Sequence, residues 1–287
     1  MDTKTPTIRS FFYNAFACML GASISNIVIF SSAFAAEEKP LWELGIGIGA
    51  LSQPFYTGTS QRRNVAFPVI LPVYRGEVLK ADDQGVRAEL FDNDRYKLDI
   101  SLDFSLAVDS DDVDLRADMP DIDNNLQIGP SLEITLAKNE RSEWRANLPI
   151  RANIGLDSGL EGLGFIFSPN ISYEKTLRIA SSAWNFGASI GPQFGTADFN
   201  NVYYGVDPEF ATASRPSFQA SSGYSGSRLQ LSMTSKNSNR LWVWFLRYEN
   251  ISGASFDESP LVETNDGLTI GLIYSRKIWQ SKKRVSR

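Results

Sequence analysis

Five charged side chains occupy positions where they could carry out acid–base chemistry or neutralise one another. They are Asp99, Asp103, Glu133, Arg145 and Arg151. Paired carboxylic acids can act as general acid and base, and such pairs hydrolyse glycosides. Asp99 and Asp103 would lie roughly 13 Å apart along one strand, too far for a pair, although Glu133 on the next strand might approach either. We favour a charge network across neighbouring strands, and we predict that the protein is not an enzyme.

Other residues for catalysis or metal binding are scarce. The chain has no histidine and a single cysteine, Cys18. Zinc sites of His and Cys, a Ser-His-Asp triad and a Cys-His pair are therefore excluded. The acidic segment 109–123 could attract calcium, but it lacks the spacing and the glycine of a calcium-binding loop, so a solvated loop is favoured. We expect no catalytic residue, no metal site and no cofactor.

The charged residues belong to segments in which apolar and polar residues alternate. In 96–108, one row is apolar, and the other carries Lys97, Asp99 and Asp103. Successive side chains of a strand point to opposite faces, so one face of this segment is apolar and the other charged. The same alternation recurs over residues 40–279. The expected strands are 42–51, 65–74, 85–91, 96–108, 126–137, 144–156, 163–175, 184–195, 216–224, 228–235, 241–251 and 267–279.

Such strands could form either a soluble antiparallel sandwich or a barrel in a membrane. The clearest strands run for about 10–13 residues, which is the length that spans a bilayer at a tilt. Trp and Tyr recur near strand ends, as the aromatic girdles of a membrane barrel require. We predict an all-β fold, a transmembrane antiparallel β-barrel of about twelve strands within a range of about ten to fourteen, apolar outside and polar inside.

The first residues have the pattern of a secretory signal peptide. Basic residues precede a mostly apolar run, and Ala33-Phe34-Ala35 resembles a cleavage site. We expect a signal peptide over 1–35, removed on export, followed by one barrel domain over 36–287. An uncleaved membrane anchor and a lipoprotein modified at Cys18 are the alternatives.

The charge balance argues against nucleic acid as a partner. The chain has 28 basic and 33 acidic residues, for a net charge of −5. A mildly acidic chain without a basic stripe binds nucleic acid poorly. Basic residues gather at the C-terminus, where a solvated tail is the default interpretation and binding to an anionic surface is the alternative.

Five short motifs follow one another along the chain. They are Trp42-x-x-Gly45-x-Gly47, Pro54-Phe55-Tyr56-Thr57-Gly58, Pro68 to Tyr74 (PVILPVY), Tyr203-Tyr204-Gly205-Val206 and Ser259-Pro260-Leu261. In this order and spacing, over about 42 to 279, the chain resembles the MipA/OmpV family of outer-membrane proteins. The resemblance implies that the motif residues Tyr203, Tyr204, Gly205, Ser259 and Pro260 shape loops, with the tyrosines able to anchor at an interface.

The resemblance also implies a location and a role. It implies insertion in the lipid of a Gram-negative outer membrane and a scaffold that joins a lytic transglycosylase to a penicillin-binding murein synthase. A small-solute channel or ligand-binding barrel with a charged lumen is the alternative. With both termini in the periplasm, the strands as counted put the connections 109–124 and 196–215 on the periplasmic side. Long loops of such barrels usually face outward. Either these two loops are the docking elements, or the weak strands at 85–91 and 216–224 are miscounted.

Overall fold

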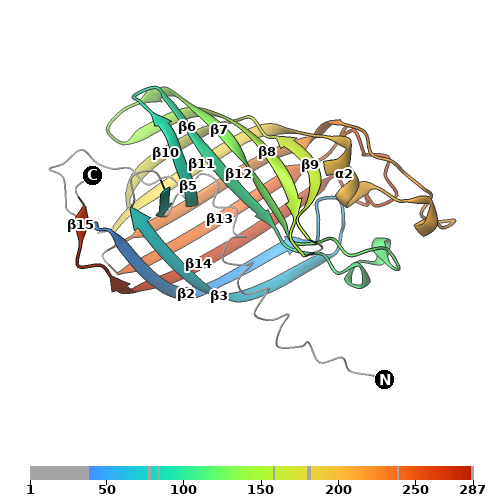
Figure 1. The fold of residues 1–287 in the computed structure, drawn as a ribbon, viewed down its shortest axis with the longest axis horizontal. Helices are drawn as coiled ribbons and strands as arrows, with labels where there is room; N and C mark the ends of the chain where they lie inside the picture. The colour runs from blue at the N-terminus through green and yellow to red at the C-terminus, as the bar shows by residue number, and fades with distance from the viewer. Residues whose placement is uncertain are drawn as a thin grey trace, which may run out of the picture.

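The fold is a closed antiparallel β-barrel whose two ends differ (Figure 1). It is taken from a computed structural model that describes residues 39–75, 79–82, 85–157, 159–179, 182–237 and 239–285. The expected signal peptide over 1–35, with Cys18 and the cleavage site, lies outside the described residues. In the described part of the chain, no helix is both long and apolar enough to cross a membrane.

The barrel wall consists of strands that are each paired with their neighbours on both sides. They are β2 (Trp42–Pro54), β3 (Arg62–Arg75), β4 (Leu79–Asp82), β5 (Gly85–Asp92), β6 (Tyr96–Ser105), β7 (Asn125–Lys138), β8 (Ser142–Gly155), β9 (Glu161–Phe167), β10 (Asn170–Ile179), β11 (Ser182–Gly195), β12 (Gly223–Lys236), β13 (Arg240–Asn250) and β14 (Asp266–Gln280). The ring closes where β14 pairs with β2, and β8 and β11 pair with both β9 and β10.

Strands β9 and β10 occupy one position in the wall. Phe167 of β9 pairs with Ile150, and Asn170 of β10 pairs with Asn147, so the two strands continue each other along β8. The 13 strands of the described sheet therefore fill twelve positions around the ring. The predicted transmembrane antiparallel barrel of about twelve strands is confirmed.

Three details of the predicted strand list are wrong. The segment 163–175 is interrupted at Ser168 and Pro169, where the Ser168 N–H donates across to the Pro149 carbonyl (3.2 Å). The segment 216–224 is mostly loop, since only Phe218 forms a bridge, with Val206, before β12 begins. The short strand β4 has no counterpart among the predicted strands, while the weak segment 85–91 is β5.

These changes decide between the two interpretations of the long connections. Because β4 adds a strand before 109–124 and the 216–224 strand is lost, both long connections lie at the barrel end opposite the first and last described residues. The connections 55–61, 106–124, 156–160, 196–222 and 251–265 share that end. The tight turns 93–95 and 139–141 lie at the other end, where β1 (Lys39–Pro40) pairs with β15 (Arg284–Val285). The interpretation that the strands around 85–91 and 216–224 were miscounted is therefore confirmed, and the strand count that put 109–124 and 196–215 on the side of the first and last strands is wrong.

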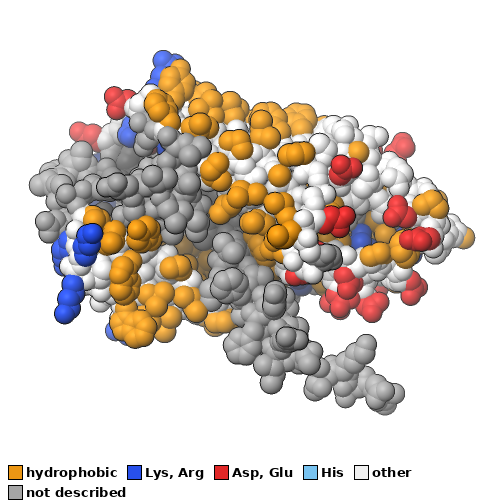
Figure 2. Space-filling view, viewed as in Figure 1, with side chains coloured by type: hydrophobic (Ala, Val, Ile, Leu, Met, Phe, Trp, Pro, Cys, Tyr) orange, Lys and Arg blue, Asp and Glu red, His pale blue; other side chains and the backbone are white. Residues whose placement is uncertain are grey.

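Apolar side chains cover the outside of the wall. On β8, Ile150 is 51% exposed while its neighbour Arg151 is 6% exposed. The outward rows of neighbouring strands repeat this pattern, and apolar side chains spread over the barrel surface (Figure 2). Aromatic pairs flank the band, with ring centroids 4.6 Å apart for Trp144 and Tyr173. An apolar exterior around a polar, charged interior is the arrangement of a barrel in a bilayer and reverses that of a soluble protein.

One sector of the interior is apolar, which corrects the expectation of a uniformly polar lumen. Phe67 and Phe245 are buried on the lumen side, beside Val243 and Ile273. Each ring lies over a glycine of the adjacent strand. A Cβ at Gly49 would lie 2.5 Å from the Phe67 ring, and one at Gly271 would lie 2.1 Å from that of Phe245. A larger residue at either position would force the phenylalanine ring to move, so glycine lets the ring pack against the backbone of the adjacent strand.

Candidate functional site

The long connections fold together into a cap over one end of the barrel (Figure 1, right). We use the name cap for connections 55–61, 106–124, 196–222 and 251–265. The cap contains η1 (Ser110–Asp112), η2 (Asp114–Arg116), α2 (Ala197–Tyr204) and η3 (Pro208–Phe210). Its buried apolar core is formed by Tyr56, Val108, Val113, Ile122, Tyr204, Val206, Ala220, Ile251, Ala254, Phe256 and Leu261. The connections are thus a packed unit rather than solvated loops.

Helix α2 brings two of the motif tyrosines into the cap. It begins after Thr196, whose hydroxyl accepts a hydrogen bond from the Phe199 N–H, and it ends at Gly205. The Tyr204 ring stacks on that of Phe256 at a centroid distance of 3.6 Å. Its hydroxyl donates to the Thr57 carbonyl (2.7 Å), so one residue joins three connections.

The remaining motif residues lie around this point. The Ser259 hydroxyl donates to the Tyr204 carbonyl (2.7 Å), which fixes the connection 251–265 to α2, and the half-buried Pro260 follows it. The Tyr203 hydroxyl accepts from the side-chain amide of Asn125 (3.3 Å), which begins β7. Burial raises the pKa of the Tyr204 hydroxyl well above its ordinary value. Both tyrosines therefore lie inside the cap, and neither lies in the outer apolar band.

Two arginines hold the acidic segment to the rest of the cap. The Arg215 guanidinium donates to the carbonyls of Leu115 and Ala117 (2.9 Å each). The Arg116 guanidinium donates to the Pro120 carbonyl (2.9 Å), and burial lowers its pKa. Within the acidic segment 109–123, aspartates accept hydrogen bonds from the segment's own backbone. Asp121, for example, accepts from the Ser110 N–H (2.8 Å). Within the described residues, no three acidic side chains come together as a metal site would require.

One contact makes the cap sensitive to acid. The Glu263 carboxylate accepts from the N–H (2.9 Å) and the hydroxyl (2.6 Å) of Ser60, and these hydrogen bonds hold the pKa of Glu263 below its ordinary value. The ionised Glu263 carboxylate therefore stabilises the folded cap fully above its unfolded pKa of about 4.3. This stabilisation is lost as the pH falls through the pKa that Glu263 has in the folded protein.

We accordingly expect hydrogen exchange at the Ser60 amide, corrected for the intrinsic rate, to lose protection as the pH falls below about 4.3. The variant Glu263→Gln should be less protected at neutral pH and should show a flatter pH dependence. Equal pH profiles for the two proteins would contradict this role of Glu263.

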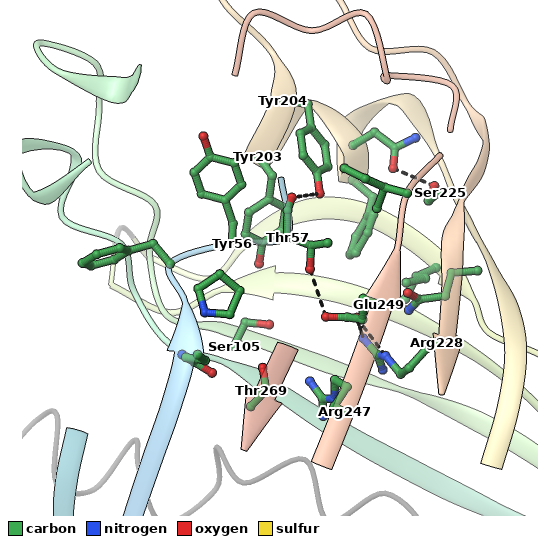
Figure 3. A pocket seen from close by; sticks show the side chains of 18 of the residues that line it. Tyr56, Thr57, Ser105, Tyr203, Tyr204, Ser225, Arg228, Arg247, Glu249 and Thr269 are labelled. Carbon is green, nitrogen blue, oxygen red and sulfur yellow. Dashed lines mark hydrogen bonds and ion pairs between the residues drawn. The ribbon is translucent and has the colours of Figure 1, made fainter. Parts of the chain in front are cut away.

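A cavity of about 150 Å³ lies between the cap and the barrel wall (Figure 3). The cap contributes tyrosines and phenylalanines, among them Tyr56, Tyr203 and Phe256. The wall contributes polar and charged side chains: Arg63, Gln127, Gln193, Arg228, Arg247, Glu249 and Thr269. An apolar roof over a charged floor is suited to a small molecule that has one polar end.

Paired charges occupy part of the floor. Arg228 of β12 donates from Nε to Glu249 Oε1 of β13 (2.9 Å), and its Nη1 lies 3.6 Å from Asp103 Oδ2 of β6. The other carboxylate oxygen of Glu249 accepts from the Thr57 hydroxyl (2.9 Å), which ties the floor to the cap. Asp103 thus reaches a strand far away in sequence.

The other predicted network residues lie deeper in the lumen. Arg145 lies 3.3 Å from Glu133 and also pairs with Glu174 of β10. Lys97 lies 3.0 Å from Asp99 and 3.6 Å from Glu133.

Arg151 lies apart from these ion pairs. Its Nε donates to the Ser101 hydroxyl (2.9 Å), and it is near enough to Asp99 and Asp103 to interact with both electrostatically. The structure therefore brings Glu133 and Arg145 together, keeps Arg151 within electrostatic range of Asp103, and adds Arg228 as an ion-pair partner of Asp103.

Several charged residues of the lumen are missing from the predicted set. Among them are Glu174, Arg228, Arg247 and Glu249. The sequence carried a signal for them, because each lies in the polar row of a strand whose other row is apolar. Arg247 and Glu249, for example, alternate with Leu246 and Tyr248. Applying the alternation rule to every strand would have found them.

Comparisons with known proteins give a family match and distant structural matches. The family described as "MltA-interacting protein MipA" matches residues 46–278. No curated protein matches the chain. A "Bacterial polysaccharide outer membrane secretin" aligns with a TM-score of 0.39 and 8% identity, over 83% of this chain and 99% of that one. The outer membrane protein OprG from Pseudomonas aeruginosa aligns with a TM-score of 0.21 and 10% identity, over 84% and 95% of the two chains.

Proposed function

The chain belongs to the MltA-interacting protein MipA family, and from this premise we propose that it is a scaffold for enzymes of murein synthesis and turnover. The protein is an outer-membrane β-barrel. The observation that carries the proposal is the extent of the family match, which covers nearly the whole barrel wall and the cap. The partner class that the family name supports is a lytic transglycosylase, and the sequence resemblance adds a penicillin-binding protein. No catalytic group is needed for such a role.

The barrel end that carries β1 and β15 is the proposed docking surface. Long loops of outer-membrane barrels face outward and short turns face the periplasm, so the cap would face outward and the β1–β15 pair would face the periplasm. Exposed basic residues gather there, among them Lys282, Lys283 and Arg284. Acidic side chains are frequent at the cap end instead (Figure 2, right). We name Lys282, Lys283 and Arg284 the basic rim and infer that it meets an acidic face of the partner.

Charge reversal tests the scaffold. We expect the triple variant Lys282→Glu, Lys283→Glu, Arg284→Glu to retain about a tenth or less of the lytic transglycosylase that co-purifies with the wild-type barrel after crosslinking. The matched control reverses three exposed acids of the cap, Asp111→Lys, Asp112→Lys and Asp114→Lys, and should leave co-purification unchanged. If co-purification were lost only in the control variant, the docking surface would lie on the cap. Absence of any murein enzyme with the wild-type protein would end the proposal.

The cap favours the scaffold over the channel alternative. Cap residues such as Tyr203 and Phe256 form one side of a cavity whose other side is the lumen wall, so the cap lies across the pore axis. We expect the wild-type barrel to show no steady conductance in a planar bilayer. Steady conductance without a murein partner would reverse the ranking of the two functions.

A further inference from the structure

We propose that the cavity beneath the cap binds a small anion that carries a carboxylate or phosphate group, and that Arg247 binds the charged group. The proposal does not depend on the scaffold role, since it concerns the opposite end of the barrel. It rests on the position of Arg247, on the hydrogen bonds that this side chain does not make, and on the surplus of positive charge around the cavity.

Arg247 is held by the barrel wall on the lumen side. It lies on β13 between Gln230 of β12 and Thr269 of β14, its partners in the antiparallel register. It lines the cavity, together with Thr269 and Arg228 (Figure 3). Because β13 is paired with a strand on each side, the backbone of Arg247 is held rigidly. Its guanidinium is therefore confined to the cavity floor.

The Nε of Arg247 is shielded from solvent and makes no hydrogen bond. No ion pair joins this guanidinium to a carboxylate of the described chain, although Asp103 and Glu249 are near enough to interact with it electrostatically. The nearest carboxylates are already engaged, since Glu249 pairs with Arg228 and accepts from Thr57, while Asp103 pairs with Arg228. A shielded, unpaired guanidinium is costly, and it is a strong site for an incoming anion because its parallel N–H groups fit a carboxylate or phosphate.

The lining of the cavity has a surplus of positive charge. It includes three guanidinium groups, those of Arg63, Arg228 and Arg247, and one carboxylate, that of Glu249. When Asp103, which lies 3.6 Å from Arg228, is counted with the lining, the formal charge of these groups is +1. The Thr269 hydroxyl and the Gln193 amide add neutral hydrogen-bonding groups. The aromatic roof leaves room for a small apolar body, so the class of ligand is a small organic acid or phosphate ester.

Calorimetry on the full-length barrel in an uncharged detergent tests the proposal, with succinate and inorganic phosphate as probes. We expect at least one probe to bind with a Kd of about 1 mM or tighter. Arg247→Gln should weaken that binding at least about tenfold, the size expected for losing a charge-assisted hydrogen bond. Succinamide, which has the shape of succinate without its charges, should not bind. The probe that binds identifies the anionic group.

Two further variants separate a specific site from general attraction. Arg247→Lys keeps the charge but loses the paired N–H groups, so its affinity should fall between those of the wild type and Arg247→Gln. Arg240→Gln removes an exposed arginine at the far end of the same strand and should leave binding unchanged. Equal losses in Arg240→Gln and Arg247→Gln would overturn the proposal, as would binding that is unaffected by Arg247→Gln.

Thermal stability provides a readout that does not rely on heats of binding. Since Arg247→Gln removes an unpaired charge, the variant should be at least as stable as the wild type without ligand. The bound anion should raise the melting temperature of the wild type and not that of Arg247→Gln. Each probe is tested at a concentration of about ten times the expected Kd. The proposal would also be overturned if neither probe gave a heat of binding or a shift in melting temperature.

Discussion

Trypsin should cut the variant Phe256→Ala after Arg116, at the Arg116–Ala117 bond, at least about 100-fold faster than it cuts the wild type. Phe256 is 1% exposed at the centre of the cap and stacks on Tyr204 at 3.6 Å. Truncating a buried phenylalanine costs about 3–5 kcal/mol, through lost contacts and the cavity left behind. The cap then opens more often, and the buried Arg116 guanidinium leaves the Pro120 carbonyl and becomes accessible to the protease.

The control for this variant is Leu160→Ala. Leu160 lies at the same end of the barrel in the connection between β8 and β9, but its side chain is 72% exposed. Its removal should leave cleavage at the wild-type rate, because no buried contact is lost. Mass analysis of the fragments locates the cut. If both variants are cut at the same rate, the cap is not held by its apolar core.

A lysine on the outer face of the barrel should destabilise it strongly. Ile190 of β11 is 59% exposed and lies in an apolar row between Trp184 and Phe194. We expect Ile190→Lys to lower the free energy of unfolding by about 2–4 kcal/mol, the cost of a basic side chain near the bilayer midplane. The measurement is the urea midpoint of the barrel in lipid vesicles, at constant slope.

The adjacent residue provides a matched control. Ser189 points to the other face of β11, where it lines a small cavity together with Glu174 and Gln230. Ser189→Lys adds the same charge on the lumen side, within reach of a carboxylate, and should cost less than half as much. If the two lysines cost the same, the inward and outward faces of this strand would have been assigned incorrectly.

The alternation of side chains predicted the fold because it is a local property of each strand. The rows of β6, β7 and β8 can be read from the sequence alone, and their outward residues are the exposed ones. The break at Pro169 could not be predicted in this way, because it depends on contacts with distant strands. The carbonyl of Pro169 lies where a Cβ at Gly191 would be, 2.0 Å away, so the break and the glycine fit each other.

The site was less predictable because it depends on how the wall closes. Sequence reasoning placed Asp103 among charges of the next strands, and Arg151 does interact with it, but the prediction omitted Arg228 of β12, which forms an ion pair with Asp103. The cap was beyond prediction for a similar reason. Its apolar core is assembled from single residues of four connections, such as Val108 and Leu261, and no one connection has a pattern that signals burial.

The seam between β14 and β2 determines when the ring can be completed. Glu43 pairs with Gln280, and Lys39 pairs with Val285, so the earliest described residues bond to the last ones. Contacts so distant in sequence form slowly, since a long loop must close before they contribute. Until the final strand has been synthesised and delivered, the growing sheet has two open edges that could pair with other chains. Biogenesis must therefore shield a curved, unclosed sheet until its C-terminal strand arrives.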